Sequence, residues 1–150
     1  MKLRIAITVL LVLLAAPAVN AGEPDYLALL AEDSEIKAIA TVSKVQKMSR
    51  NGDGTFTRVV FKRVYALTPF TPKSFVGACK VMESKWQKRT EGFVYFKPRQ
   101  GQRVYVTITT NGGAITSYTP VSSELDHVVR KEPHRLAYSK GRASVIPSQE

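Results

Sequence analysis

The chain has 150 residues, 44% hydrophobic and 23% charged, a balance typical of a folded globular protein rather than a disordered one. Twenty-two lysines and arginines against 12 aspartates and glutamates give a net charge of +10, which favours an acidic partner. The single cysteine excludes a disulfide within the chain, and no CxxC or HExxH spacing that would indicate a zinc site is present.

The first 21 residues have the pattern of a secretory signal peptide. Lys2 and Arg4 give a positive start, residues 3–19 are almost wholly apolar, and Val19-Asn20-Ala21 offers a cleavage site to a signal peptidase. An uncleaved membrane anchor is the alternative, but the run is shorter than the ~20 residues of a comfortable span, and Pro17 interrupts it. We therefore expect cleavage after Ala21, a periplasmic or secreted bacterial protein, and no transmembrane segment in the remaining chain.

Residues 22–150 are expected to form a single domain. A domain of that length buries roughly two thirds of its unfolded surface, so it needs no metal or disulfide to fold. Its charge is uneven: residues 22–60 hold five basic and six acidic side chains, whereas residues 61–150 hold fifteen and six. The asymmetry fits a basic surface facing an acidic partner, and it equally fits ordinary solubility with charged strand edges that oppose aggregation.

The first half of the domain predicts one helix followed by a long hairpin. Residues 24–33 begin with a proline and carry an apolar stripe, as a short amphipathic helix does. Residues 36–48 and 55–67 read as strands, and the turn formers of residues 49–54 join them. Strand 55–67 has apolar residues on both faces, which indicates a strongly bent strand in a closed or nearly closed barrel.

The middle of the chain predicts further strands. A proline-rich loop at residues 68–72 leads to a weaker strand at 75–82 and a polar, basic loop at 83–91. Residues 92–119 follow as three strand-like runs separated by two turns, the pattern of a three-stranded antiparallel meander.

Side chains alternate cleanly along the second run of that meander. The two faces are Val104, Val106 and Ile108 on one side and Arg103, Tyr105, Thr107 and Thr109 on the other. Because successive side chains of a strand point to opposite faces, we expect the valine side in the core. The side that carries Tyr105 and Thr107 is expected to face solvent or to be only lightly covered.

The C-terminal part predicts a second short helix and one more strand. In residues 123–131, Ser123 and Asp126 have the spacing of a capping box, and an apolar stripe follows. Pro133 ends the helix, and residues 136–138 are strand-like.

Residue patterns of catalysis are nearly absent. His127 and His134 are the only histidines, and there is no Gly-x-Ser-x-Gly elbow and no phosphate loop. Cys79 lies in a partly apolar strand, where burial as a small hydrophobe is favoured over an intermolecular disulfide or a reactive thiol. A catalytic site assembled from distant residues is the alternative, but we expect no catalytic residue, metal, cofactor or disulfide.

Aromatic and basic side chains are interleaved before and within the meander. Stacking aromatics beside a positive groove is how barrel domains hold single strands and other polyanions. Cross-strand packing of the aromatics, with the charges solvated, is the alternative. The candidates for ligand binding are Lys97, Arg99, Arg103 and Tyr105, and the wider set adds Trp86, Lys88, Arg89 and Tyr95.

The order of these elements resembles the start of the netrin and tissue-inhibitor-of-metalloproteinases module. A signal, a short helix, IKAIATVSKV, FTRVVFKRVYAL, a proline-rich loop and the later GQRVYVTITTNGGAITSYTPV carry the resemblance, which covers residues 27–121. It implies an all-β fold with minor helix: a five-stranded OB-like barrel with a short N-terminal and a short C-terminal helix.

The animal inhibitors of that module chelate the protease zinc through an N-terminal cysteine and carry several disulfides. The expected mature start here is Gly22-Glu23-Pro24, and Cys79 is the single cysteine, so protease inhibition is not implied. We expect an exported, non-enzymatic binding module that engages a protein partner or an acidic polymer through a basic, aromatic face. The alternatives are a periplasmic hydrolase with a non-obvious active site and a structural accessory protein of the cell envelope.

Export predicts a shortened chain. N-terminal sequencing of the protein from its native host should begin at or near Gly22, because the signal is removed after Ala21. Cytoplasmic material that begins at Met1 would contradict the prediction.

Overall fold

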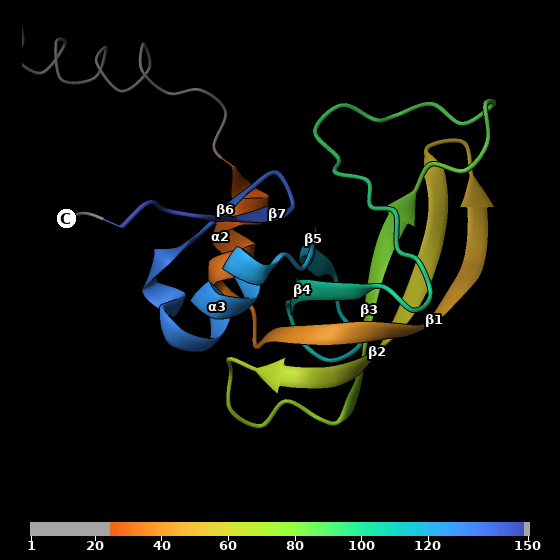
Figure 1. Cartoon of the computed structure of the whole chain (residues 1–150). Coiled ribbons are helices and arrows are strands. Elements are labelled where there is room, and N and C mark those ends of the chain that lie inside the picture. Colours follow the sequence, from red (N-terminus) through yellow and green to blue (C-terminus); the bar gives the residue numbers. More distant parts are fainter. Residues whose placement is uncertain (1–24, 149–150) are drawn as a thin grey trace, which may run out of the picture.

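The computed structural model describes residues 25–148, so the predicted signal peptide lies outside the described residues. Strands outweigh helices in this part of the chain (Figure 1), which confirms the predicted all-β class with minor helix. The elements in order are helix α2 (Tyr26–Asp33), strands β1 (Ile36–Asn51), β2 (Gly54–Ala66), β3 (Ser74–Val81), β4 (Arg103–Ile108) and β5 (Ile115–Pro120), helix α3 (Ser123–Lys131), the 3₁₀ turn η1 (Pro133–Arg135), and strands β6 (Leu136–Ser139) and β7 (Arg142–Val145).

Strands β1 to β5 form a five-stranded antiparallel sheet in the order β3-β2-β1-β4-β5. The central strand is β1, which pairs with β2 from Ala38 to Asn51 and with β4 from Ile36 to Thr41. Three register shifts interrupt the β1–β2 pairing, and such bulges bend a strand and increase its twist. In Figure 1, β1 runs beside β4 and then turns away with β2 and β3.

Both faces of the sheet are buried, against different partners. The main core lies on one face, where Phe61 stacks on Phe75 with ring centroids 5.3 Å apart. It contains the three residues predicted from the alternation of β4, Val104, Val106 and Ile108, which are confirmed as core positions. On the other face, helix α3 and the β6–β7 hairpin cover a second cluster that includes Ile39 and Tyr105 (Figure 1).

The sequence pattern puts Tyr105 and Thr107 on the solvent side of β4, and this expectation is wrong. Both side chains are fully buried. The hydroxyl of Tyr105 lies 2.7 Å from that of Tyr138 on β6. Oγ1 of Thr107 lies 2.7 Å from Oγ1 of Thr116 and 2.6 Å from Oγ of Ser117. The alternation of β4 is as predicted, but elements far along the chain cover its second face. A strand's alternating pattern shows which residues share a face and not whether another element covers that face.

The first strand of the meander and the cap of helix α3 differ from the sequence prediction, and several strand ends shift by a few residues. Residues 92–96, predicted as the first strand of the meander, form no strand, and the Phe96 N–H donates to Lys80 O at 3.1 Å. The free edge of β3 is already bonded to the β4–β5 turn, because Ala78 N–H donates to Gly113 O at 2.9 Å. Residues 92–96 therefore reach β3 only near its C-terminal end. Helix α3 spans the predicted residues, but its N-cap is Ser122, whose Oγ accepts from Leu125 N–H at 3.1 Å.

Cys79 on β3 is buried, with 7% of its surface exposed. Burial raises the pKa of its thiol to about 12, so the sulfur stays protonated at neutral pH. Because the thiolate is the nucleophile in cysteine chemistry, this site supports the prediction of a small buried hydrophobe.

The buried hydroxyls around Thr107 predict a clear stability difference. Thr107→Asp should lower the free energy of unfolding by ~3 kcal/mol or more, because an unpaired charge replaces a satisfied hydroxyl in a closed site. Thr110→Asp, at an exposed position of the β4–β5 turn, is the matched control and should change it little. Urea unfolding followed by circular dichroism measures both, and equal losses would contradict the burial of Thr107.

Candidate functional site

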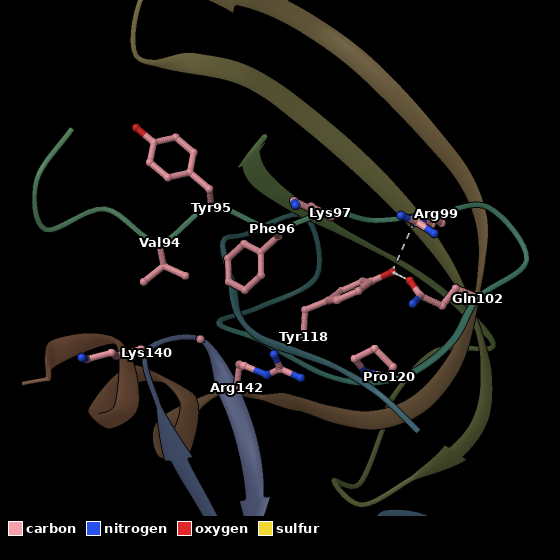
Figure 2. Close-up of a pocket in the computed structure, with 11 residues that line it drawn as sticks. Val94, Tyr95, Phe96, Lys97, Arg99, Gln102, Tyr118, Pro120, Lys140 and Arg142 are labelled. Carbon is pink, nitrogen blue, oxygen red and sulfur yellow. Dashed lines mark hydrogen bonds between the residues drawn. The ribbon is translucent and has the colours of Figure 1, made fainter. Parts of the chain in front are cut away.

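A pocket of about 390 Å³ lies between residues 94–99, strand β5 and the β6–β7 turn (Figure 2). Its walls are predominantly basic and aromatic, and no carboxylate lines it. This basic pocket is lined by Val94, Tyr95, Phe96, Lys97, Arg99, Gln102, Tyr118, Pro120, Lys140, Gly141 and Arg142.

Tyr118 of β5 forms the floor of the basic pocket. Its ring is buried against Phe96, with centroids 6.4 Å apart. Its hydroxyl donates to Gln102 Oε1 at 2.5 Å and accepts from the backbone N–H of Arg99 at 3.4 Å. Burial raises the pKa of Tyr118 to about 12, so the floor carries a neutral hydroxyl at physiological pH. Figure 2 shows this hydroxyl at the Arg99 end of the pocket.

Four exposed cations stand around that floor: Lys97, Arg99, Lys140 and Arg142. Among the described residues, none of their side-chain charges forms an ion pair with a carboxylate. Like charges held close together create a positive local potential. The pocket is therefore suited to an anionic group, for which the two guanidinium groups offer two-pronged hydrogen bonds.

The β6–β7 turn packs closely against β5 and residues 94–96, and this contact brings Lys140 and Arg142 next to Lys97 and Arg99. Gly141, at the tip of the β6–β7 hairpin, accepts from Tyr118 N–H at 2.9 Å. A Cβ at this glycine would lie 2.8 Å from Val94 and 2.9 Å from Phe96, and its φ of +80° also favours glycine. The neighbouring Lys140 and Arg142 are thereby held beside the 94–99 segment.

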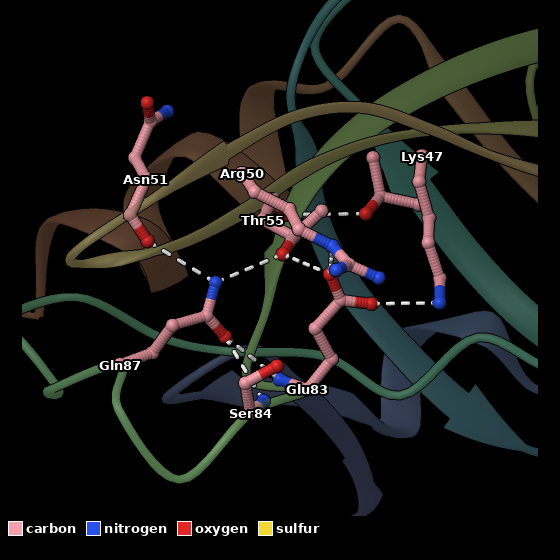
Figure 3. Close-up of polar contacts among 8 residues, drawn as sticks. Lys47, Arg50, Asn51, Thr55, Glu83, Ser84 and Gln87 are labelled. Carbon is pink, nitrogen blue, oxygen red and sulfur yellow. Dashed lines mark hydrogen bonds and ion pairs between the residues drawn. The ribbon is translucent and has the colours of Figure 1, made fainter.

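A polar network fixes the loop that leads into this segment (Figure 3). The buried Gln87 donates through Nε2 to Asn51 O at 3.1 Å and to Thr55 Oγ1 at 2.9 Å. Its Oε1 accepts from the N–H groups of Glu83 at 3.0 Å and Ser84 at 3.2 Å. All four polar positions of the amide face the loop or the β1–β2 hairpin, so Gln87 clamps one to the other.

Glu83 completes the same network. Its carboxylate accepts from Thr55 Oγ1 at 2.6 Å and lies 2.7 Å from both Lys47 Nζ and Arg50 Nε. The hydrogen bond from Lys47, followed by that from Thr55, lowers the pKa of Glu83 to about 2. Every group is paired, so the cluster acts as a structural tie rather than as a reactive site.

The structure brings together two of the four candidate ligand residues. Lys97 and Arg99 line the basic pocket. Arg103 lies apart, 3.8 Å from Asp126 of helix α3. Tyr105 is a correction: its ring is fully buried in the second cluster, so it presents no face to a ligand.

Sequence reasoning missed Lys140 and Arg142. They lie some forty residues from Lys97 and Arg99 in the chain, so no short-range spacing links the two pairs. A Lys-Gly-Arg turn after a strand-like run is the available signal, and it predicts a hairpin without saying where the hairpin packs.

In residues 25–148 no cluster of three or more histidines, cysteines, aspartates and glutamates is arranged to hold a metal ion. No helix in this described part of the chain has the length and apolar character needed to span a membrane. Comparison with protein-family models, curated proteins and solved structures finds no match for the chain.

The lowered pKa of Glu83 predicts an acid-dependent loss of stability. A depressed carboxyl pKa in the folded state stabilises the fold above the ordinary value of 4.5, and this contribution disappears as pH falls towards 2. The stability difference between wild type and Glu83→Gln should therefore shrink between about pH 5 and pH 2. Urea unfolding across that range tests this, with Glu91→Gln at an exposed position as the control. A difference that stays constant with pH would contradict the prediction.

Proposed function

We propose that this chain is an exported, non-enzymatic binding module that engages an anionic group of an acidic polymer or protein partner through the basic pocket. The observation that carries the proposal is the set of four cations that line the pocket above Tyr118, none of which forms an ion pair with a carboxylate among the described residues. Cations bind anions well because charge-assisted hydrogen bonds are roughly twice as strong as neutral ones. The export part of the proposal rests on the N-terminal pattern alone.

The pocket's chemistry favours binding over catalysis. A hydrolase needs a general base or a nucleophile that is ionised at the working pH. The lining contains no histidine, carboxylate or thiol, and the Tyr118 hydroxyl has a raised pKa. The residues that line the basic pocket can hold and orient an anion, but they offer no group to take its proton.

We further propose that the sheet has the arrangement of an OB-like barrel, as the resemblance to the netrin module implies. Two observations support this. The strand order leaves β3 and β5 as the edges, and Ala78 of β3 forms a parallel bridge with Ala114, next to β5. A Cβ at Gly77 of β3 would lie 2.6 Å from Ile115, so a residue without a side chain allows the edges to approach. OB-like barrels bind polymers on their outer faces and loops.

Substituting the four cations tests the binding proposal. The variant Lys97→Gln/Arg99→Gln/Lys140→Gln/Arg142→Gln should elute from heparin at lower salt than wild type. With a single-stranded oligothymidylate as the probe, the slope of log affinity against log salt should become shallower by about 3, because roughly four cations no longer release counterions.

A control of equal charge makes the test specific. Lys44→Gln/Lys62→Gln/Lys73→Gln/Lys131→Gln removes four exposed lysines that lie outside the basic pocket. Circular dichroism should show both variants folded. If the two variants elute at the same salt concentration, the charge of the whole protein and not the pocket controls binding, and the proposal fails.

A further inference from the structure

An apolar groove of about 630 Å³ adjoins the basic pocket. It lies between helix α2, residues 92–96, strand β3 and the β4–β5 turn. Its floor includes the buried Cys79 and Ile115. Its rim carries large apolar side chains with unusual exposure: 70% for Tyr26, 53% for Phe93 and 48% for Leu30. Clustered exposed apolar side chains of this kind mark a surface that another molecule covers.

The groove and the basic pocket lie side by side and share two lining residues. Val94 and Phe96 line both of them. A further hollow lies along helix α2 next to both regions and is lined by Asp25, Tyr26, Leu27, Gly92, Phe93, Val94 and Lys140. We call the three neighbouring hollows together the channel; its basic-pocket end is cationic and its groove end is apolar.

The few charges beside the apolar part already have partners. The Lys80 ammonium pairs with Asp53 and lies 5.1 Å from the centroid of the Phe93 ring. Asp25 accepts from the N–H groups of Ala28 at 3.0 Å and of Lys140 at 2.9 Å. An occupant of the groove consequently meets apolar surface, and its charge is recognised only at the basic end.

The backbone along the groove is also occupied. Ala78 N–H donates to Gly113 O, Phe96 N–H to Lys80 O, and Gly112 N–H to Val76 O, at 2.9, 3.1 and 2.8 Å. A peptide that binds by adding a strand needs free N–H and C=O groups at a sheet edge. These paired groups do not offer them, which favours an occupant with few polar atoms along its length.

We propose that the channel binds one single-chain anionic amphiphile as a monomer. Its phosphate, sulfate or carboxylate head lies among Lys97, Arg99, Lys140 and Arg142, and its alkyl or acyl chain passes Val94 and Phe96 to reach Leu27, Leu30 and Phe93. This inference rests on the proposed function, because the head occupies the basic pocket. Charge complementarity at one end and apolar complementarity along the rest select this class of ligand.

Calorimetric titration with octyl, decyl and dodecyl phosphate, each below its critical micelle concentration, tests the inference. Affinity should rise by about two- to fourfold for each added methylene, the upper value corresponding to full burial of the group. Dodecyltrimethylammonium, which has the same chain and the opposite charge, should not bind. Binding that does not depend on chain length overturns the amphiphile inference but leaves anion binding by the pocket intact, whereas loss of both alkyl phosphate and heparin binding removes the proposed function as well.

Variants separate the two parts of the channel. Leu30→Gln should flatten the dependence on chain length, while Leu29→Gln should not, because Leu29 is equally exposed on helix α2 but does not line the groove. Lys97→Gln/Arg99→Gln should weaken all three alkyl phosphates by a similar factor and keep the dependence on chain length. Equal effects of the Leu29 and Leu30 substitutions would overturn the inference.

A vesicle experiment distinguishes a free amphiphile from a membrane. Sedimentation with vesicles of anionic phospholipid should leave the protein mainly in solution, because the channel accommodates one chain. Binding to vesicles without binding to monomeric alkyl phosphates would overturn the proposal and identify the exposed apolar rim as a membrane contact.

Discussion

The bend of strand β1 is the constraint on which the rest of the structure depends. Residues Ala38 to Thr41 pair on both sides, with β2 and β4, and the rest of the strand follows β2 into a second direction. Bulges at three points of the β1–β2 ladder make this turn without breaking the pairing. Because the sheet curves, its edges at Ala78 and Ala114 come close enough to bridge, and Gly77 leaves the room they need.

The second face of the curved sheet is also buried. Helix α3 and the β6–β7 hairpin pack on it, so residues that alternate away from the main core are buried as well. Tyr105 and Thr107 remain compatible with that burial because each hydroxyl has a partner, Tyr138 for one and Thr116 with Ser117 for the other. The packing that removes Tyr105 from the surface also carries the hairpin tip at Gly141 to Tyr118.

The basic pocket follows from that placement. Four cations from two distant segments line one pocket whose floor carries a neutral hydroxyl, and their mutual repulsion is a cost that an anion would relieve. The 94–99 segment has little regular structure of its own, but the Gln87 network holds its preceding loop and Phe96 is buried beneath it. A site fixed in this way binds with less loss of side-chain and loop freedom than a mobile one.

The sequence alone determined the all-β class, the two helices, most strand ranges and the core positions Val104 and Val106, because local periodicity and turn residues encode them. It did not determine whether the opposite face of β4 would be covered, since that depends on a helix and a hairpin from the end of the chain. Lys97 and Arg99 were recognisable as candidates, but only the tertiary structure joined them to Lys140 and Arg142 and separated them from Arg103 and Tyr105. Contacts between residues forty positions apart are set by packing, and no spacing rule in a single sequence records them.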